Sequence, residues 1–245
     1  MPSLQLAVAL ALALLIAPAF NQGASAQTQP VILTRSKPPK PPSAPPPDGS
    51  RQGGGGLSQS SPSCKNTQKQ FTALTPLNAS HRLTTGSGPT FWFYVPYAPE
   101  AVRSGRFSLL TQDEKSYIYK TDFTLPKTPG IVSIPIPSSN STLFKEGKVY
   151  HWYLELYCQH QANSQPDLQV HGWIQRVAPT ADSKSLIDAA MPDIWYDALT
   201  RLANLYIASP QDAKLQADWA RLLKSAQLEE VAREKLVGAV LPVKE

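Results

Sequence analysis

Two cysteines, Cys64 and Cys158, are the first residues in the chain that could form a covalent link or a metal site. In an exported protein, an even number of cysteines most simply forms disulfides. We therefore expect a bridge between Cys64 and Cys158 that constrains the long loop between them. The alternative is a metal site of Cys158, His160 and His171, which would lack a fourth ligand and would leave Cys64 unpaired.

Two pairs of residues have side chains suited to acid–base catalysis. His151 and Glu155 share one face of a predicted strand, but strand residues four apart are separated by about 13 Å, too far for direct cooperation. Asp193 and Asp197 fit better as charges near the positive N-terminal end of a helix. The sequence has no Gly-x-Ser-x-Gly elbow, His-Glu-x-x-His motif or phosphate-binding loop. We expect no catalytic residue, metal or cofactor, with a hydrolase that uses an unrecognised carboxylate and histidine site as the alternative.

Aromatic residues on a long predicted strand, residues 149–158, indicate a binding face. Its polar side carries Tyr153 and Tyr157 on either side of Glu155, and aromatic rings beside a carboxylate suit a sugar or a peptide. The alternative, which we prefer, is that C-terminal helices cover this side, because those helices need an apolar surface to pack on. Arg176, which could pair with an acidic side chain or contact an anion, completes the predicted binding face of Tyr153, Glu155, Tyr157 and Arg176.

The elements that would position these residues are short strands between residues 71 and 177. Apolar and polar residues alternate in them, aromatic residues are frequent, and turn residues separate them. This pattern is typical of a mainly β chain, and we predict an antiparallel Ig-like β-sandwich over residues 64–180.

After residue 180 the apolar period becomes helical. Residues 194–206 form an apolar stripe, and Ser209-Pro-Gln-Asp212 has the pattern of a helix N-cap followed by proline. A second helix follows this cap, and a third is predicted over residues 227–237. We expect residues 181–245 to form a C-terminal helical hairpin and tail that packs on the sandwich as one structural unit.

Residues 1–26 have the pattern of a cleavable signal peptide. Their apolar run is too short to span a membrane, and small residues precede the expected cleavage between Ala26 and Gln27. No later stretch is long and apolar enough for a transmembrane segment. We therefore expect an exported protein that is periplasmic or extracellular.

Residues 27–63 are rich in proline and glycine and are predicted to be a disordered basic linker. The net charge of +5 lies on residues 27–70, while the remaining charges balance, so we expect no nucleic-acid partner. The linker could contact an anionic wall, a membrane surface or a proline-binding protein. The alternative, which the composition favours, is a solubilising spacer.

Several motifs occur together in a distinctive order: Pro89 to Tyr97, Pro129 to Ile134, Tyr150-x-Trp152, Cys158, Gly172 to Val177, Trp195 to Leu199 and Trp219 to Leu223. Over about residues 64–237 the chain thereby resembles a family of exported cyanobacterial proteins known as domain of unknown function 928. The resemblance implies a shared fold and export, but no activity and no catalytic residue. We predict a non-catalytic cell-envelope module that binds a partner protein or a polysaccharide, with the hydrolase as the alternative.

Overall fold

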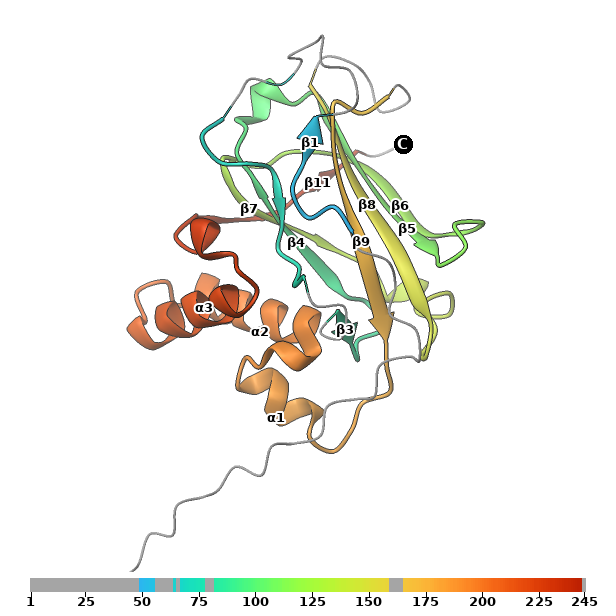
Figure 1. Ribbon diagram of the computed structural model, residues 1–245, viewed down its shortest axis with the longest axis vertical. Helices are drawn as coiled ribbons and strands as arrows, with labels where there is room; N and C mark the ends of the chain where they lie inside the picture. The colour runs from blue at the N-terminus through green and yellow to red at the C-terminus, as the bar shows by residue number, and fades with distance from the viewer. Residues whose placement is uncertain (1–48, 56–63, 65–66, 78–81, 159–164, 244–245) are drawn as a thin grey trace, which may run out of the picture. The chain divides into compact units, whose positions relative to one another are not determined.

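The computed structural model describes residues 49–55, 64, 67–77, 82–158 and 165–243 (Figure 1). The predicted signal peptide, its cleavage site at Ala26 and Gln27, and most of the predicted linker lie outside the described residues. The described residues form a mainly β structure of two mixed sheets, one of them a half-barrel, with a C-terminal pair of helices. The predicted mainly β class and the helical pair are therefore confirmed.

The larger sheet has seven strands, and its centre is the antiparallel set β9–β8–β5–β6. In β8, the sequence His-Trp-Tyr-Leu at 151–154 alternates between the outer face and the core, as expected for a pleated strand with one face buried. The strands are β1 Gly54–Gly55, β3 Leu83–Thr84, β5 Ser104–Thr111, β6 Tyr117–Thr124, β8 Val149–Tyr157, β9 Leu168–Arg176 and β11 Leu241–Pro242.

The smaller sheet has the order β10–β7–β4–β2, formed by β2 Thr72–Ala73, β4 Thr90–Val95, β7 Gly130–Pro135 and β10 Leu236–Ala239. Each sheet contains one parallel pair, β3 with β9 and β10 with β7. The predicted antiparallel arrangement therefore holds for the long strands only. Strands of 2 and 4 residues, such as β3 and β10, carry too little alternation to reveal their partner or direction.

Aromatic side chains fill the space between the sheets. The ring centroid of Phe91 in β4 lies 4.9 Å from that of Phe107 in β5 and 5.9 Å from that of Trp152 in β8. Tyr196 enters this cluster from the helical segment and accepts a hydrogen bond from Trp152 Nε1 at 3.0 Å. Its hydroxyl also donates to the Trp173 carbonyl oxygen at 3.0 Å. The helices and both sheets therefore share one core.

The helices are α1 Ser183–Asp188, α2 Trp195–Ala208 and α3 Ala213–Ser225. Within the part of the chain that the structure describes, no helix has the length and apolar composition needed to span a membrane. The N-cap of α3 is Asp212 rather than the predicted Ser209, because Asp212 Oδ1 accepts from the amides of Lys214 at 2.8 Å and Leu215 at 3.1 Å.

The prediction of a third helix over residues 227–237 is wrong. A single 3-10 turn, Glu229–Val231, is followed by β10, which pairs with β7, and by β11, which pairs with β6. Gly238 has φ +103°, outside the helical region. Strand pairing at the edges of both sheets outweighs the local helical pattern.

Helix α2 packs against the smaller sheet. Trp92, on the outer side of β4, is 4% exposed, and its Nε1 donates to Thr200 Oγ1 of α2 at 3.0 Å. Asp197 of α2 accepts from the amide and hydroxyl of Thr85 at 2.7 and 2.6 Å, so this carboxylate fixes α2 to the segment after β3. Figure 1 shows the helices on the side of β4, away from β5 and β6.

Candidate functional site on the larger sheet

The outer face of the larger sheet, here called the open face, is formed by alternate residues of four neighbouring strands. Cross-strand pairing places Arg106 between Asp122 and Glu155, and Ser108 between Lys120 and Tyr153. The remaining members are Leu110, Tyr117, His151, Tyr157, Gln169, His171 and Trp173. The open face therefore combines aromatic rings with charged and amide side chains.

A groove of about 460 Å³ lies on the open face, and its lining includes Arg106, Tyr153, Glu155, Tyr157 and Gln169. Glu155 accepts hydrogen bonds from Gln169 Nε2 at 3.3 Å and from the Tyr157 hydroxyl at 3.1 Å. The guanidinium of Arg106 is held by Asp122, at 2.6 and 2.9 Å. The polar groups are thus oriented by one another before any ligand binds.

The structure brings together three of the four residues of the predicted binding face. Tyr153 and Glu155 are half-buried in the groove lining, but Tyr157 is only 1% exposed, so its ring offers no stacking surface. Burial, together with Glu155, raises the pKa of Tyr157, which keeps its hydroxyl protonated as a donor. The helices do not cover this face (Figure 1), so the preferred prediction, coverage by the C-terminal helices, is wrong for Tyr153 and Glu155.

Arg176 lies apart from the other three predicted residues. Its Nη1 donates to the Phe144 carbonyl oxygen at 2.5 Å, and its Nη2 lies 3.6 Å from Glu146 Oε1. These contacts attach the 143–148 loop to the end of β9. Of the two roles considered from the sequence, the structure therefore shows pairing within the fold.

A chain of hydrogen bonds crosses the open face beside the groove. His151 Nδ1 lies 2.6 Å from Glu114 Oε1, and His151 Nε2 lies 2.9 Å from His171 Nδ1. An ionised carboxylate only accepts hydrogen bonds, so neutral His151 donates from Nδ1 and accepts from His171 Nδ1. Tyr153 joins the chain by donating to Glu114 at 3.0 Å, and Trp173 stacks on His151 with ring centroids 3.9 Å apart.

Burial and hydrogen bonds set the pKa values of this cluster. It lowers the pKa of His151, and burial together with the neighbouring His151 lowers the pKa of His171. The hydrogen bond from His151 lowers the pKa of Glu114, while burial and Glu114 raise the pKa of Tyr153 to about 12. The resting cluster therefore contains neutral imidazoles, a carboxylate and a protonated phenol.

Sequence reasoning missed the partnership of His151 with Glu114, because it compared His151 only with nearby Glu155. Glu114 lies 37 residues away in the turn between β5 and β6 and has φ +58°, a left-handed conformation that costs a non-glycine residue about 1 kcal/mol or more. The pairing of Leu110 with His151 brings this turn beside β8. Only the register of distant strands could have revealed the pair.

Tyr117 was also missed, because of a β-bulge. Strict alternation predicts that Tyr117 and Tyr119 share one face, but the register shifts so that Leu109 pairs with Tyr119 and Leu110 with Tyr117. The extra residue, Ile118, is buried, and Tyr117 turns outward with 56% of its surface exposed. Lys120 Nζ lies 5.4 Å from its ring centroid. The bulge therefore adds an exposed aromatic ring to the groove.

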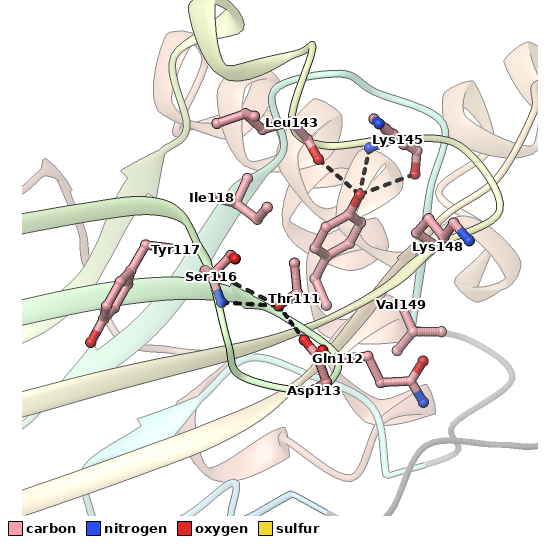
Figure 2. Close-up of a pocket in the computed structure, with 11 residues that line it drawn as sticks. Thr111, Gln112, Asp113, Ser116, Tyr117, Ile118, Leu143, Lys145, Lys148 and Val149 are labelled. Carbon is pink, nitrogen blue, oxygen red and sulfur yellow. Dashed lines mark hydrogen bonds between the residues drawn. The ribbon is translucent and has the colours of Figure 1, made fainter.

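A second hollow, of about 740 Å³, lies on the other side of Tyr117, which lines both sites. Figure 2 shows Ser116 and Tyr117 on the β5–β6 hairpin, with Leu143 and Lys145 on the facing loop. The Tyr150 hydroxyl lies 2.5 Å from the Lys145 amide, which donates to it, and itself donates to the Leu143 carbonyl oxygen at 3.0 Å. The wall of this hollow is therefore fixed to β8.

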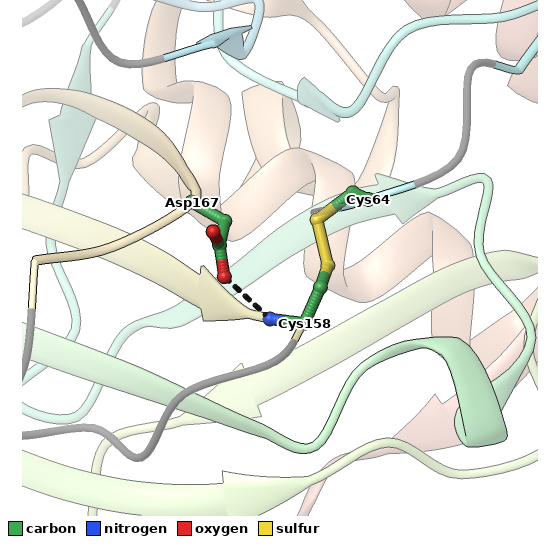
Figure 3. Close-up of a disulfide and its surroundings, with 3 residues drawn as sticks. All are labelled: Cys64, Cys158 and Asp167. Atoms are coloured by element: carbon green, nitrogen blue, oxygen red, sulfur yellow. Dashed lines mark hydrogen bonds between the residues drawn. A yellow bond between two sulfur atoms is a disulfide. The ribbon is translucent and has the colours of Figure 1, made fainter. Parts of the chain in front are cut away.

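Cys64 and Cys158 form a disulfide in the structure, with Cα atoms 5.4 Å apart, as the sequence favoured (Figure 3). The Cys158 amide donates to Asp167 Oδ2 at 2.8 Å. Although the two sulfurs and Asp167 lie within 4.8 Å of one another, sulfurs in a disulfide are not the thiolates that bind metals. His171 pairs with Tyr153, five residues and thus about 16 Å from Cys158. His160 lies outside the described residues.

The open face thus presents two aromatic rings and several hydrogen-bonding groups to a ligand.

Among curated proteins and among solved structures, no match was found. A family described as Domain of Unknown Function (DUF928) matches residues 48–236, about three quarters of the chain. This protein therefore belongs to the DUF928 family.

Proposed function

We propose that this protein is a non-catalytic binding module that holds a polysaccharide on the open face. The observation that supports this function is the groove of about 460 Å³, where the rings of Tyr117 and Tyr153 lie among polar groups of Arg106, Glu155 and Gln169. Sugars present apolar C–H faces and hydroxyls together. Aromatic faces and paired donors and acceptors match both properties.

The charge of the groove favours a neutral glycan. Arg106 is already paired with Asp122, and Lys120 is the other cation in the lining, while Glu114 and Glu155 contribute negative charge. An acidic polysaccharide would meet these two carboxylates, so it would gain little from the cations. We therefore prefer neutral sugars to acidic ones, and sugars to the partner protein also considered from the sequence.

We also propose that the protein is exported to the periplasm or beyond the cell, in a cyanobacterial envelope. The sequence pattern of residues 1–26 supports export, and so does the Cys64–Cys158 disulfide, because disulfides persist in oxidising compartments. Residues 27–48 would then act as a tether near an anionic wall or membrane surface, whereas residues 49–55 belong to the fold, because Gly54 and Gly55 pair with β9 and Gln52 pairs with Thr72. The two sheets facing across an aromatic core support a variant of the Ig-like sandwich.

Binding to a panel of neutral oligosaccharides from envelope polysaccharide tests the proposal, with calorimetry on the purified protein. Tyr117→Ser and Glu155→Gln should each weaken binding about tenfold, the loss expected for one stacked ring or one charged hydrogen bond. Ile207→Ser, at an exposed position of α2, is the matched control and should bind normally. Unchanged binding by both groove variants would contradict the proposal, and capture of a protein instead would favour the partner-protein function.

The chain Glu114–His151–His171 favours a second candidate function, a hydrolase of envelope glycans. His171 Nε2 makes no hydrogen bond with any residue that the structure describes, so it could accept a proton from water. Release of reducing ends from the same oligosaccharides would reveal this activity. If the protein is a hydrolase, His171→Gln should abolish turnover while oligosaccharide binding remains. If it is a binding module, neither the unmutated protein nor the variant should show turnover.

A further inference from the structure

We propose that the hollow beyond Tyr117 binds a small amphiphilic anion, an organic acid with an apolar body and one carboxylate, sulfonate or phosphate group. This site shares Tyr117 with the glycan groove of the open face, but its other lining residues are different. Its volume of about 740 Å³ falls in the range of small-ligand sites, about 300 to 1,000 Å³.

The lining of the hollow is mostly apolar. Ile118, Val149 and Tyr150 are buried residues that contribute to it. Leu143 and Tyr117 line it as well and are 50% and 56% exposed, respectively. Large apolar side chains exposed around one hollow, over a buried apolar base, mark a binding surface. A ligand with an apolar body would remove these side chains from water.

The charge at the hollow selects an anion. Lys145 and Lys148 line it, and within the part of the chain that the structure describes neither has a carboxylate partner within 4 Å. The carboxylate of Asp113, also in the lining, accepts from the Thr111 hydroxyl at 2.6 Å and from the Lys115 amide at 3.3 Å. The acid is therefore engaged by its own turn, while the two lysines can bind an anionic group.

The walls of the hollow are held in place without a ligand. The Tyr150 hydroxyl binds the backbone of Leu143 and Lys145, and Phe144 between them is fully buried, 4.5 Å from the Tyr150 ring centroid. Asn140 Nδ2 donates to the Ile118 carbonyl oxygen at 2.8 Å and ties the start of this loop to β6. A preformed site loses little conformational entropy on binding, which favours a small ligand.

Fluorescence of anilinonaphthalene sulfonate, an amphiphilic anion, tests the site with the full chain. N-phenylnaphthylamine has the same aromatic rings without the sulfonate and is the matched neutral ligand. We expect saturable binding of the sulfonate at one site and competition by octanoate. The double variant Lys145→Gln/Lys148→Gln should weaken sulfonate binding about tenfold and leave binding of the neutral ligand unchanged. Leu143→Ser should weaken binding of both.

Lys127→Gln, at another exposed lysine, is the control and should bind both ligands normally. Circular dichroism checks that each variant is folded. The proposal is overturned if the sulfonate does not bind saturably, if the neutral ligand binds as tightly, or if the double lysine variant binds like the control. Tyr117 is left unchanged throughout, so the result does not depend on the glycan groove.

Discussion

The outer faces of the two sheets differ in what covers them, although both carry aromatic residues. On the smaller sheet, Trp92 and Tyr94 are 4% and 5% exposed, because α2 and the C-terminal segment lie against them. On the larger sheet, Tyr117 is 56% exposed, and Tyr153 is half-buried beside a groove. Trp92 and Tyr94 therefore stabilise the fold, whereas Tyr117 and Tyr153 are available to a ligand.

The disulfide should give the largest stability effect, because it connects the segment before β2 of the smaller sheet with the end of β8 in the larger one. It closes a sequence separation of 94 residues. Replacing both cysteines, Cys64→Ser/Cys158→Ser, should lower the free energy of unfolding by about 4 to 5 kcal/mol through loop entropy. Urea denaturation measures the loss. Reduction of the unmutated protein should reproduce it, and an unchanged midpoint in both experiments would show that the bridge does not constrain the fold.

Replacing an aromatic residue by alanine should lower the free energy of unfolding more on the covered face of the smaller sheet than on the open face of the larger sheet. Trp92→Ala on the covered face should cost about 3 to 5 kcal/mol, because it creates a cavity under α2 and leaves Thr200 without its indole partner. Tyr153→Ala on the open face should cost about 1 to 2 kcal/mol. Urea denaturation of both variants checks the order. Equal losses would mean that the open face is as structural as the covered one.

Acidification should lower the free energy of unfolding, because protonation of His151, His171 and Glu114 disrupts the cluster on the open face. The pKa values of His151 and His171 are lowered below the usual 6.5, so the unfolded chain binds more protons than the native one as the pH falls through that range. The contribution of the two histidines to the free energy of unfolding is fully present above pH 6.5 and is lost as the pH falls below that value. The lowered pKa of Glu114 adds a further loss below its usual 4.5.

The measurement is the unfolding midpoint between pH 4 and 8, with histidine titration by NMR. His151→Phe should flatten the dependence between pH 5 and 7. A midpoint that rises as the pH falls from 7 to 5 would contradict the assigned protonation of the cluster.

Tyr117→Ser should have the smallest effect on stability, within about 0.5 kcal/mol, because the side chain is exposed. The same substitution should nevertheless weaken glycan binding about tenfold. Thermal unfolding and calorimetry on one preparation measure both quantities. A large loss of stability would show that Tyr117, like Trp92, stabilises the fold.

The sequence was most informative where a regular period extends over many residues. It predicted the mainly β class, the α2–α3 pair and the outward position of Tyr153 and Glu155, since alternation in β8 runs over nine residues. It failed where pairing between distant segments decides the outcome. The bulge that exposes Tyr117, the short strand β10 in place of a helix and the pairing of Glu114 with His151 depend on strand register, which local patterns do not encode.

Ligand mapping by backbone amide NMR tests the central account most directly. Neutral oligosaccharides from envelope polysaccharide are added to the purified protein, and shifted amides are assigned to the two sheets. We predict shifts concentrated on β5, β6, β8 and β9 around Tyr117, Tyr153 and Glu155, with α2 and α3 unchanged. Shifts confined to the helices and the smaller sheet, or no shifts with any oligosaccharide, would contradict the open face as the binding site.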